Sequence, residues 1–210
     1  MRKLIMAGGL AALTLGLLTG CSSKDTPPVA KVPAAAETTE TPQIVTAKTA
    51  FWPMYKAARA WSTDVVLIRL TAKPVQGYTN GAGKAGLWEA VFGSPSLHQY
   101  RTYTYSIVAV PPTIHKGVAS GFAIPWRGET RDAMAIDLTQ FNVDSDTAFV
   151  TASTTAADWL KKNPNKELAS LEMGQTYRFQ GPVWYMLWGD KKSGYNALVD
   201  GGSGKLLSKK

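Results

Sequence analysis

The sequence has few residues of the types that build metal sites, disulfides or hydrolytic centres. It contains one cysteine, Cys21, and two histidines, His98 and His115. A single cysteine cannot form a disulfide within the chain, so the fold must be held together by its core. No HExxH, CxxC or HxH spacing occurs, and neither does Gly-x-Ser-x-Gly. The sequence therefore predicts no metal, no cofactor and no catalytic residue.

Dense runs of basic residues are missing as well. The longest are lysine pairs at 161–162, 191–192 and 209–210, and removing residues 1–20 lowers the formal net charge only from +8 to +6. Nucleic-acid-binding proteins carry a basic patch or stripe, so we expect no nucleic-acid partner. Aromatic residues are plentiful instead, with 7 Trp, 8 Tyr and 6 Phe. These large side chains favour a substantial core.

The first 21 residues have the order of an export signal. Arg2 and Lys3 precede an apolar stretch at 4–19, which ends in Leu18-Thr19-Gly20-Cys21. This ending resembles the lipobox of bacterial lipoproteins, which implies cleavage before Cys21 and attachment of lipid to its thiol and new amino group. Ser22, rather than Asp, at the next position then indicates sorting to an outer membrane, facing the periplasm or the surface.

Two alternatives to lipidation remain. Cleavage at a different small residue would leave Cys21 as a free thiol. A single transmembrane anchor would need about 20 apolar residues, more than the stretch at 4–19 provides.

The region behind Cys21 reads as a spacer. Residues 22–43 are rich in Pro, Ala and Thr and contain no aromatic residue, so they cannot bury enough surface to order themselves. The predicted organisation is a signal peptide at 1–20, a lipid-anchored disordered linker at 21–43, a first α+β unit at 44–109, a crossover segment at 110–142 and a second α+β unit at 143–210.

The body of the chain repeats itself. Aligning 45–61 with 143–159, at a constant shift of 98, gives identity at six of 17 positions, where unrelated sequences would share roughly one. The segments 88–93 and 184–189, at a shift of 96, share their Trp and Gly. This repeated order of similar segments predicts a diverged duplication.

Each copy is predicted to be a helix followed by an antiparallel meander. Thr46 and Asp144 are N-cap candidates, and apolar residues at helical spacing continue to Trp61 and to about Lys162. Pro53 makes the first helix either kink there or begin there. Strands or aromatic-rich runs follow at 64–70, 87–92, 100–107, 167–172, 177–179, 183–188 and 195–199. Between the copies, 110–140 is mostly loop, with a short half-buried strand at 134–138.

The C-terminal segment 196–207, Asn-Ala-Leu-Val-Asp-Gly-Gly-Ser-Gly-Lys-Leu-Leu, resembles the closing hairpin of PepSY domains. The likeness covers about 65 residues from Val143 onward; in the first copy Tyr105-Ser106-Ile107 stands where the Asp-x-x-Ser-Gly turn would be. The resemblance implies tandem PepSY-like α+β units that act as binding or inhibitory modules rather than catalysts.

The crossover segment contains the most site-like stretch. Its members combine a stacking ring, two guanidinium groups and two carboxylates: Trp126, Arg127, Glu129, Arg131 and Asp132. Binding residues concentrate on ordered loops. The alternative is a surface loop with local ion pairs and one buried ring.

Trp184 and Trp188 are a second candidate surface. In strand geometry they share one face with Met186, while Tyr185 and Leu187 share the other. Either these tryptophans pack in the core, with the second face meeting the other copy, or they line a groove for a peptide or carbohydrate.

Taken together, these patterns favour a non-catalytic, lipid-anchored envelope protein that binds a peptide or a partner protein and contacts the membrane through the lipid on Cys21. One alternative is a carbohydrate-binding lipoprotein that holds a glycan. The other is a hydrolase of envelope polymers, which would need two of the carboxylates Glu89, Glu129, Asp132 and Asp137 across a cleft.

Overall fold

Two α-helices, one short 3-10 helix and nine strands make up residues 42–210, the part of the chain that this computed structural model describes. The predictions for the signal peptide, for Cys21 and for nearly all of the linker fall outside these residues. The elements are α1 (Ala47–Trp61), β1 (Val66–Lys73), β2 (Leu87–Ser94), β3 (Gln99–Ser106), β4 (Gly117–Ser120), β5 (Ile124–Pro125), η1 (Leu138–Gln140), α2 (Ser145–Lys162), β6 (Leu168–Gly174), β7 (Val183–Trp188), β8 (Tyr195–Asp200) and β9 (Leu206–Lys209).

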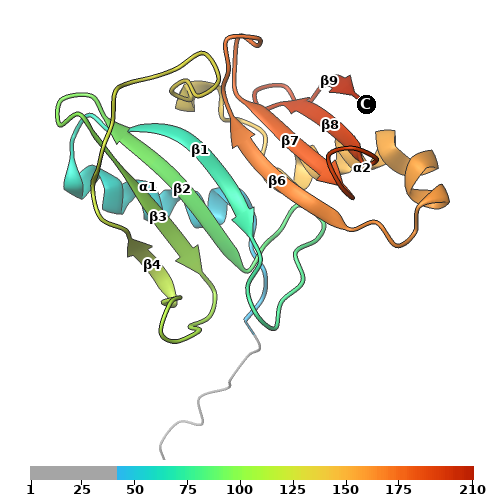
Figure 1. The fold of residues 1–210 in the computed structure, drawn as a ribbon, viewed down its shortest axis with the longest axis horizontal. Coiled ribbons are helices and arrows are strands. Elements are labelled where there is room, and N and C mark those ends of the chain that lie inside the picture. The colour runs from blue at the N-terminus through green and yellow to red at the C-terminus, as the bar shows by residue number, and fades with distance from the viewer. Residues whose placement is uncertain (1–41) are drawn as a thin grey trace, which may run out of the picture. The chain divides into compact units, whose positions relative to one another are not determined.

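All nine strands belong to one antiparallel sheet. Its order is β4-β3-β2-β1-β6-β7-β8-β9. The short strand β5 pairs with the beginning of β3, and β4 pairs with the end of β3. Both long helices cover the same face, and the other face carries no helix (Figure 1). We call residues 42–128 the first half, residues 129–210 the second half, and the face without helices the open face. The predicted mixed α+β class is confirmed, and the two parts share one sheet instead of forming separate lobes.

Local sequence explains where the long helices begin and end. The Thr46 and Asp144 side chains cap α1 and α2 by accepting the backbone N–H groups of Thr49 and Ser145. Pro53 lies inside α1, so the alternative that the helix begins at Pro53 is wrong. α2 ends at Lys162, just before the Asn-Pro pair at 163–164. Neither helix within residues 42–210 is long and apolar enough to cross a membrane.

The two halves repeat several structural details. The indole N–H of Trp88 donates to the Val45 carbonyl at 3.0 Å, and that of Trp184 donates to the Val143 carbonyl at 3.0 Å. Both tryptophans are fully buried. The register slips by one residue between Leu67 and Arg69 in β1, and again between Leu168 and Ser170 in β6. The tryptophans and their acceptors correspond at the shifts of 96 and 98 found in the sequence, and the β-bulges correspond at a shift of 101 residues.

The halves meet at the helix N-termini and at the first strand of each meander. The Ala47 N–H donates to the buried hydroxyl of Ser145 at 2.8 Å, and the Lys48 N–H donates to the Asp144 carboxylate at 3.0 Å. In the sheet, Thr71 of β1 lies opposite Glu172 of β6. Ala47 and Ser145 are equivalent positions in the alignment, and contact between equivalent positions is the signature of a two-fold arrangement.

A single core runs through both halves. It joins Phe51 and Met54 of α1 with Trp88 of β2, and continues through Phe141 to Trp184 of β7. Residues 42–210, with both long helices and all nine strands, form one compact unit. This part of the chain therefore has what it needs to fold on its own.

Three local predictions need correction. Residues 134–138 do not form a strand: Ile136 makes one isolated bridge to Leu67, and Asp137 caps the 3-10 helix η1. The segment 110–140 is mostly loop, as predicted, but it also contains the short strands β4 and β5, which were not predicted. Residues 177–179 form a turn. The first and third errors share a cause, because the partners Leu67 of Ile136 and Arg131 of Tyr177 are far away in the sequence.

Candidate functional site

Trp184 and Trp188 do not line an exposed groove. Trp184 is fully buried and Trp188 is 4% exposed, and both face the helices. Trp188 packs against Phe149 of α2, with ring centroids 6.0 Å apart. The groove interpretation is therefore wrong for Trp184, and Trp188 contributes only an edge to the second cavity described below. The expectation that Tyr185 and Leu187 would meet the other half face to face is also wrong, because the halves join edge to edge.

The five candidates of the crossover segment are spread along the sheet instead of meeting in one cleft. The Trp126 ring lies flat against Gly93 of β2, where an added Cβ would come 2.7–2.9 Å from ring carbons. Arg127 is exposed, and Glu129 accepts the Ala135 N–H at 2.9 Å. The Arg131 guanidinium stacks on Tyr177 at 4.0 Å. The remaining candidate, Asp132, borders a cavity.

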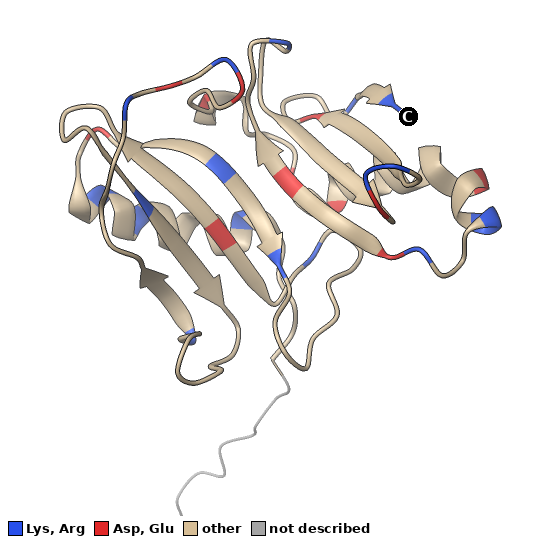
Figure 2. Cartoon of the chain, in the orientation of Figure 1, with Lys and Arg blue, Asp and Glu red and all other residues tan. Residues whose placement is uncertain are grey.

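That cavity lies on the open face, where β1 and β6 join the two halves. Its volume is about 400 Å³, and we call it the seam cavity. The strands β1, β6, β7 and β8 supply its floor, and the segments at 132–133 and 175–179 supply its walls. Figure 2 marks charged residues on the ribbons of β1 and β6. In this cavity Asp132, a predicted site residue of the crossover segment, lies with Arg69 of the first half and Glu172 of the second half.

The seam cavity combines apolar surface with four charged side chains. Ile68, Phe179, Val183 and Leu198 are its apolar part. The charged residues are Arg69, Asp132, Glu172 and Arg178. Within residues 42–210 the ion pairs are Lys73–Glu89 and Lys166–Asp190, so none of these four groups is neutralised by a close partner. A ligand with both cationic and anionic groups could complement them.

Tyr185 adds a directional hydroxyl to this cavity. It lies opposite Glu172 on β6 and Leu198 on β8, so the three side chains form a row across the open face. Burial, and then the negative charge of Glu172, raises the pKa of Tyr185 above its ordinary value. The phenol therefore stays protonated at neutral pH and remains available as a hydrogen-bond donor.

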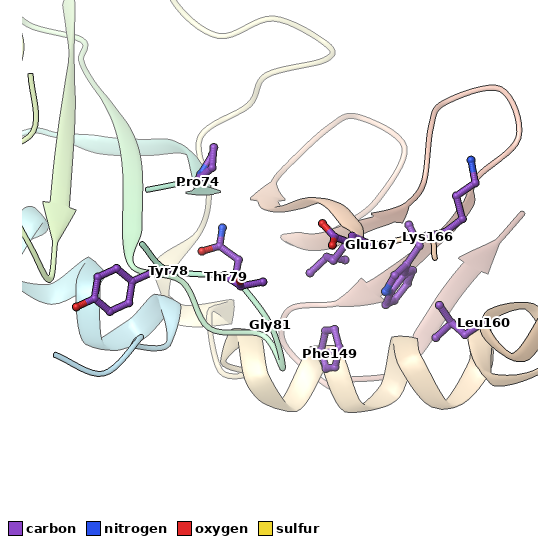
Figure 3. Close-up of a pocket in the computed structure, with 11 residues that line it drawn as sticks. Pro74, Tyr78, Thr79, Gly81, Phe149, Leu160, Lys166 and Glu167 are labelled. Carbon is purple, nitrogen blue, oxygen red and sulfur yellow. The ribbon is translucent and has the colours of Figure 1, made fainter. Parts of the chain in front are cut away.

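A second cavity, of about 480 Å³, lies between the β1–β2 loop, α2 and the start of β6 (Figure 3). Phe149, Leu160 and the edge of Trp188 provide apolar surface there. Two of its polar side chains have structural partners: the Asn80 amide donates to the Lys73 carbonyl at 3.0 Å, and Lys166 pairs with Asp190 at 3.4 Å. Glu167 is its one charged side chain without an ion-pair partner among the described residues. This cavity offers fewer free polar groups than the seam cavity.

The carboxylates considered for hydrolysis are mostly engaged in structure. Glu89 pairs with Lys73 at 3.2 Å. Asp137 accepts the Thr139 hydroxyl and N–H, and these hydrogen bonds lower its pKa. Among residues 42–210 no three His, Cys, Asp or Glu side chains converge as a metal site would require.

Four residues of the seam cavity escaped the sequence analysis: Arg69, Glu172, Arg178 and Tyr185. Arg69 lies more than 100 residues before the other three, so no local motif could join all four. One signal was present in β1, where Arg69, Thr71 and Lys73 alternate with apolar neighbours and mark a solvent-facing side.

No model of a known protein family matches the sequence, and no curated protein matches it either. Among solved structures, the crystal structure of a protein described as a "putative lipoprotein" from Clostridium difficile 630 superposes with a TM-score of 0.48 and 10% sequence identity. The match covers 74% of this chain and 88% of that chain. At this level of likeness the description belongs to that protein, and the function of this chain is argued from its own residues.

Proposed function

We propose that the chain is a lipid-anchored envelope protein whose folded part binds a peptide segment of another protein in the seam cavity. The anchor would be lipid on Cys21, as the resemblance of Leu18-Thr19-Gly20-Cys21 to a lipobox implies. Ser22 favours the outer membrane. Lipid burial contributes about 0.8 kcal/mol per methylene, so a multiply acylated cysteine would hold the chain stably.

The anchor has a direct test. Replacing Cys21 by Ala should release the protein from membranes, or leave it unprocessed at its signal sequence. Salt-resistant membrane attachment of Cys21→Ala, unchanged from wild type, would contradict lipidation. Mass spectrometry of the mature N-terminus distinguishes an acylated Cys21 from a free thiol.

We further propose that the folded part consists of two PepSY-like units. The recurring Trp–carbonyl hydrogen bond and the recurring β-bulge support this proposal. So does the β8–β9 turn, in which Asp200 accepts the N–H of Ser203 at 2.6 Å and its hydroxyl at 2.8 Å. The Asp-x-x-Ser-Gly stretch thus has a physical role, because the carboxylate closes the hairpin on which the resemblance rests.

A peptide is the ligand class that the seam cavity fits best. The observation that carries this proposal is the set of two cations and two anions without close ion-pair partners around an apolar floor. A peptide brings apolar side chains, backbone donors and acceptors, and charges of both signs to the same site. The cavity volume of about 400 Å³ suits a few side chains.

Selection of displayed random peptides against residues 42–210 tests this proposal. Wild type should enrich a sequence motif, and Arg178→Gln and Glu172→Gln should each weaken binding of the selected peptide roughly tenfold. Lys191→Gln and Asp158→Asn, on distant surfaces, are charge-matched controls. Absence of an enriched motif, or equal binding by the seam variants and controls, would remove the seam cavity as the site.

Carbohydrate binding is the second candidate, because the cavity of Figure 3 is bordered by Tyr78, Phe149 and the edge of Trp188. Aromatic rings in a shallow cavity are typical of sugar recognition. Glycan-array binding that is lost in Phe149→Ala and retained in Glu172→Gln would favour this function over peptide binding. Loss in Trp126→Ala instead would point to the crossover segment.

We propose no catalytic role. Asp132 and Glu172 both border the seam cavity, so the hydrolase alternative reduces to this pair. Turnover of envelope polymers that disappears in Glu172→Gln would overturn the non-catalytic proposal.

A further inference from the structure

Charge is divided unequally between the two halves. Residues 42–128 contain nine Lys and Arg and two acidic residues, Asp64 and Glu89, for a net charge of +7. Residues 129–210 contain ten of each sign, for a net charge of zero. The net positive charge of the described residues is therefore concentrated in the first half, whose outer edge is formed by β4 and β5 (Figure 2).

The free edge of the first half contains no acidic residue at all. No Asp or Glu occurs from residue 90 to residue 128, a stretch that supplies the end of β2 and all of β3, β4 and β5. Its cations are Arg101, Lys116 and Arg127. Lys116 and Arg127 are exposed at the two ends of the edge segment, whereas Arg101 stacks on Trp61 of α1 at 4.9 Å.

The same edge exposes large apolar side chains. Phe122 is 93% exposed, Leu97 and Ile124 are each 45% exposed, and Val118 is 36% exposed. Main-chain pairing places Ile124 and Leu97 at the same end of β3, because Ile124 pairs with Tyr100 and the Trp126 N–H donates to the His98 carbonyl at 2.8 Å. Val118, opposite Tyr105, lies toward the other end of the edge. Clustered exposed apolar side chains in a soluble body mark an interaction surface.

A β-bulge makes Phe122 protrude. Ser120 lies opposite Tyr103, the Gly121 N–H bonds to the Thr102 carbonyl, and Ile124 lies opposite Tyr100. The edge segment therefore holds one more residue than β3 between these pairings. Such a bulge breaks the row of free backbone groups that an added strand would need. Strand addition by a partner protein is disfavoured here.

We propose that this edge, which we call the docking edge (Leu97 and residues 116–127), rests on an anionic phospholipid surface. Phe122 would enter the boundary between headgroups and acyl chains, and Lys116 and Arg127 would lie against lipid phosphates. Charge complementarity supports this occupant, since residues 116–127 carry two exposed cations and no acidic residue and would be attracted to anionic lipid. Cations beside inserted aromatic side chains are the combination that interfacial membrane segments use.

The length of chain ahead of the folded part agrees with this occupant. Twenty residues separate Cys21 from residue 42, and they can span at most about 70 Å when extended. A lipid on Cys21 would thus keep the docking edge within reach of the bilayer. The docking edge is a separate proposal from the seam cavity, and its test needs no lipid on the protein.

Vesicle co-sedimentation of unlipidated residues 42–210 tests the docking edge. Vesicles of phosphatidylcholine with phosphatidylglycerol should bind the protein, vesicles of phosphatidylcholine alone should bind it weakly, and high salt should reduce binding. Phe122→Ser should weaken partitioning roughly tenfold, and Lys116→Gln and Arg127→Gln about fivefold each.

The matched controls lie in the neutral half. Val150→Ser, at a position 63% exposed on α2, and the double variant Lys191→Gln, Lys192→Gln should bind vesicles as wild type does. Phe122 has almost no buried surface, so an unchanged thermal midpoint will separate lost docking from lost folding.

Two results would overturn the proposal. One is no preference for phosphatidylglycerol, and the other is equal binding by Phe122→Ser and Val150→Ser. If Phe122→Ser instead abolishes peptide binding while vesicle binding persists, the edge docks protein. Seam variants such as Arg178→Gln should keep vesicle binding. The peptide-binding and membrane-docking proposals can therefore be tested independently of each other.

Discussion

The first and second halves of the sheet bury equivalent side chains and expose different ones. Leu67 and Leu168 lie at the two bulges, opposite Phe92 and Trp188 respectively. On the helices, Met54 of α1 corresponds to Ala152 of α2, and both are fully buried. The second half thus has the smaller helix residue and the larger strand residue. Interiors tolerate exchanges that conserve total volume, which explains how the two halves build one core from different side chains.

The surfaces are under no such constraint. The first half carries +7 and ends in the bulged edge with Phe122, and the second half carries no net charge and ends in the hairpin closed by Asp200. The buried residues of the two halves therefore reflect their common fold. Exposed residues that differ between equivalent positions are the better candidates for function.

The largest expected effect comes from the equivalent tryptophans. Trp88→Ala and Trp184→Ala should each reduce the free energy of unfolding by about 3–5 kcal/mol, because each removes a buried ring together with its indole hydrogen bond. Urea denaturation measures both losses. Trp52→Ala, at a position 55% exposed, should cost less than about 0.5 kcal/mol. If only one of the two tryptophan variants loses stability, the two tryptophans do not play equivalent structural roles in the two halves.

The bond between the halves should have an intermediate effect. Ser145→Ala leaves the buried Ala47 N–H without its acceptor, so we expect a loss of about 1–2 kcal/mol. Ser153→Ala, whose hydroxyl bonds only within α2, is the control for helix propensity. Equal stability of the two variants would mean that this contact contributes nothing to joining the halves.

Acid sensitivity provides a third comparison. Hydrogen bonds from the Ser62 and Ser94 hydroxyls lower the pKa of Asp64 in the first half, and the Ser193 hydroxyl and N–H lower that of Asp190 in the second. A folded-state pKa below the unfolded value of about 3.9 contributes stability above that pH, and the contribution is lost as pH falls toward the folded pKa.

Asp64→Asn and Asp190→Asn should therefore lower the Tm at neutral pH and narrow the difference in Tm between neutral and acidic solution. Asp158→Asn, on the outer side of α2, is the control. A Tm difference that stays as wide as in wild type would show that these hydrogen-bonded carboxylates do not set the acid limit.

The smallest effect is expected for the ion pair between Lys73 and Glu89 on the open face. Its side chains are 40% and 25% exposed, and pairs of this kind contribute about 0.2–1 kcal/mol. The corresponding second-half residues are Gly174 and Tyr185, so the pair has no counterpart. A double-mutant cycle with Lys73→Gln and Glu89→Gln measures the coupling, which should shrink at high salt. Salt-independent coupling would point to a packing contact instead.

Much of the fold follows from local sequence. The caps at Thr46 and Asp144 and the apolar spacing of each helix predicted α1 and α2, because capping and amphipathic periodicity act within a few residues. The strand predictions failed at 134–138, where Ile136 and Leu138 alternate with polar residues. That segment has one bridge to β1 and no neighbouring strand to complete a ladder.

The candidate site was much less predictable. Of seven proposed binding residues, Asp132 borders the seam cavity, and Trp184 was misassigned because a strand with bulky residues on both sides does not reveal which side the helix will cover. Which side of β7 faces the helices is fixed only by the tertiary structure, in which β7 pairs with β6 and β8.

By itself, the sequence predicted an export signal at its N-terminus, showed a repeated order of segments and located the main helices and most of the strands. Those features depend on residues close together in the chain, or on two copies that can be compared. The tertiary structure alone decided that β1 pairs with β6, which brings Arg69, Glu172 and Arg178 around one cavity. It also decided that the acid-free stretch lies along one free edge with Phe122 exposed. Contacts across about 100 residues depend on strand pairing and register, and no local pattern encodes these.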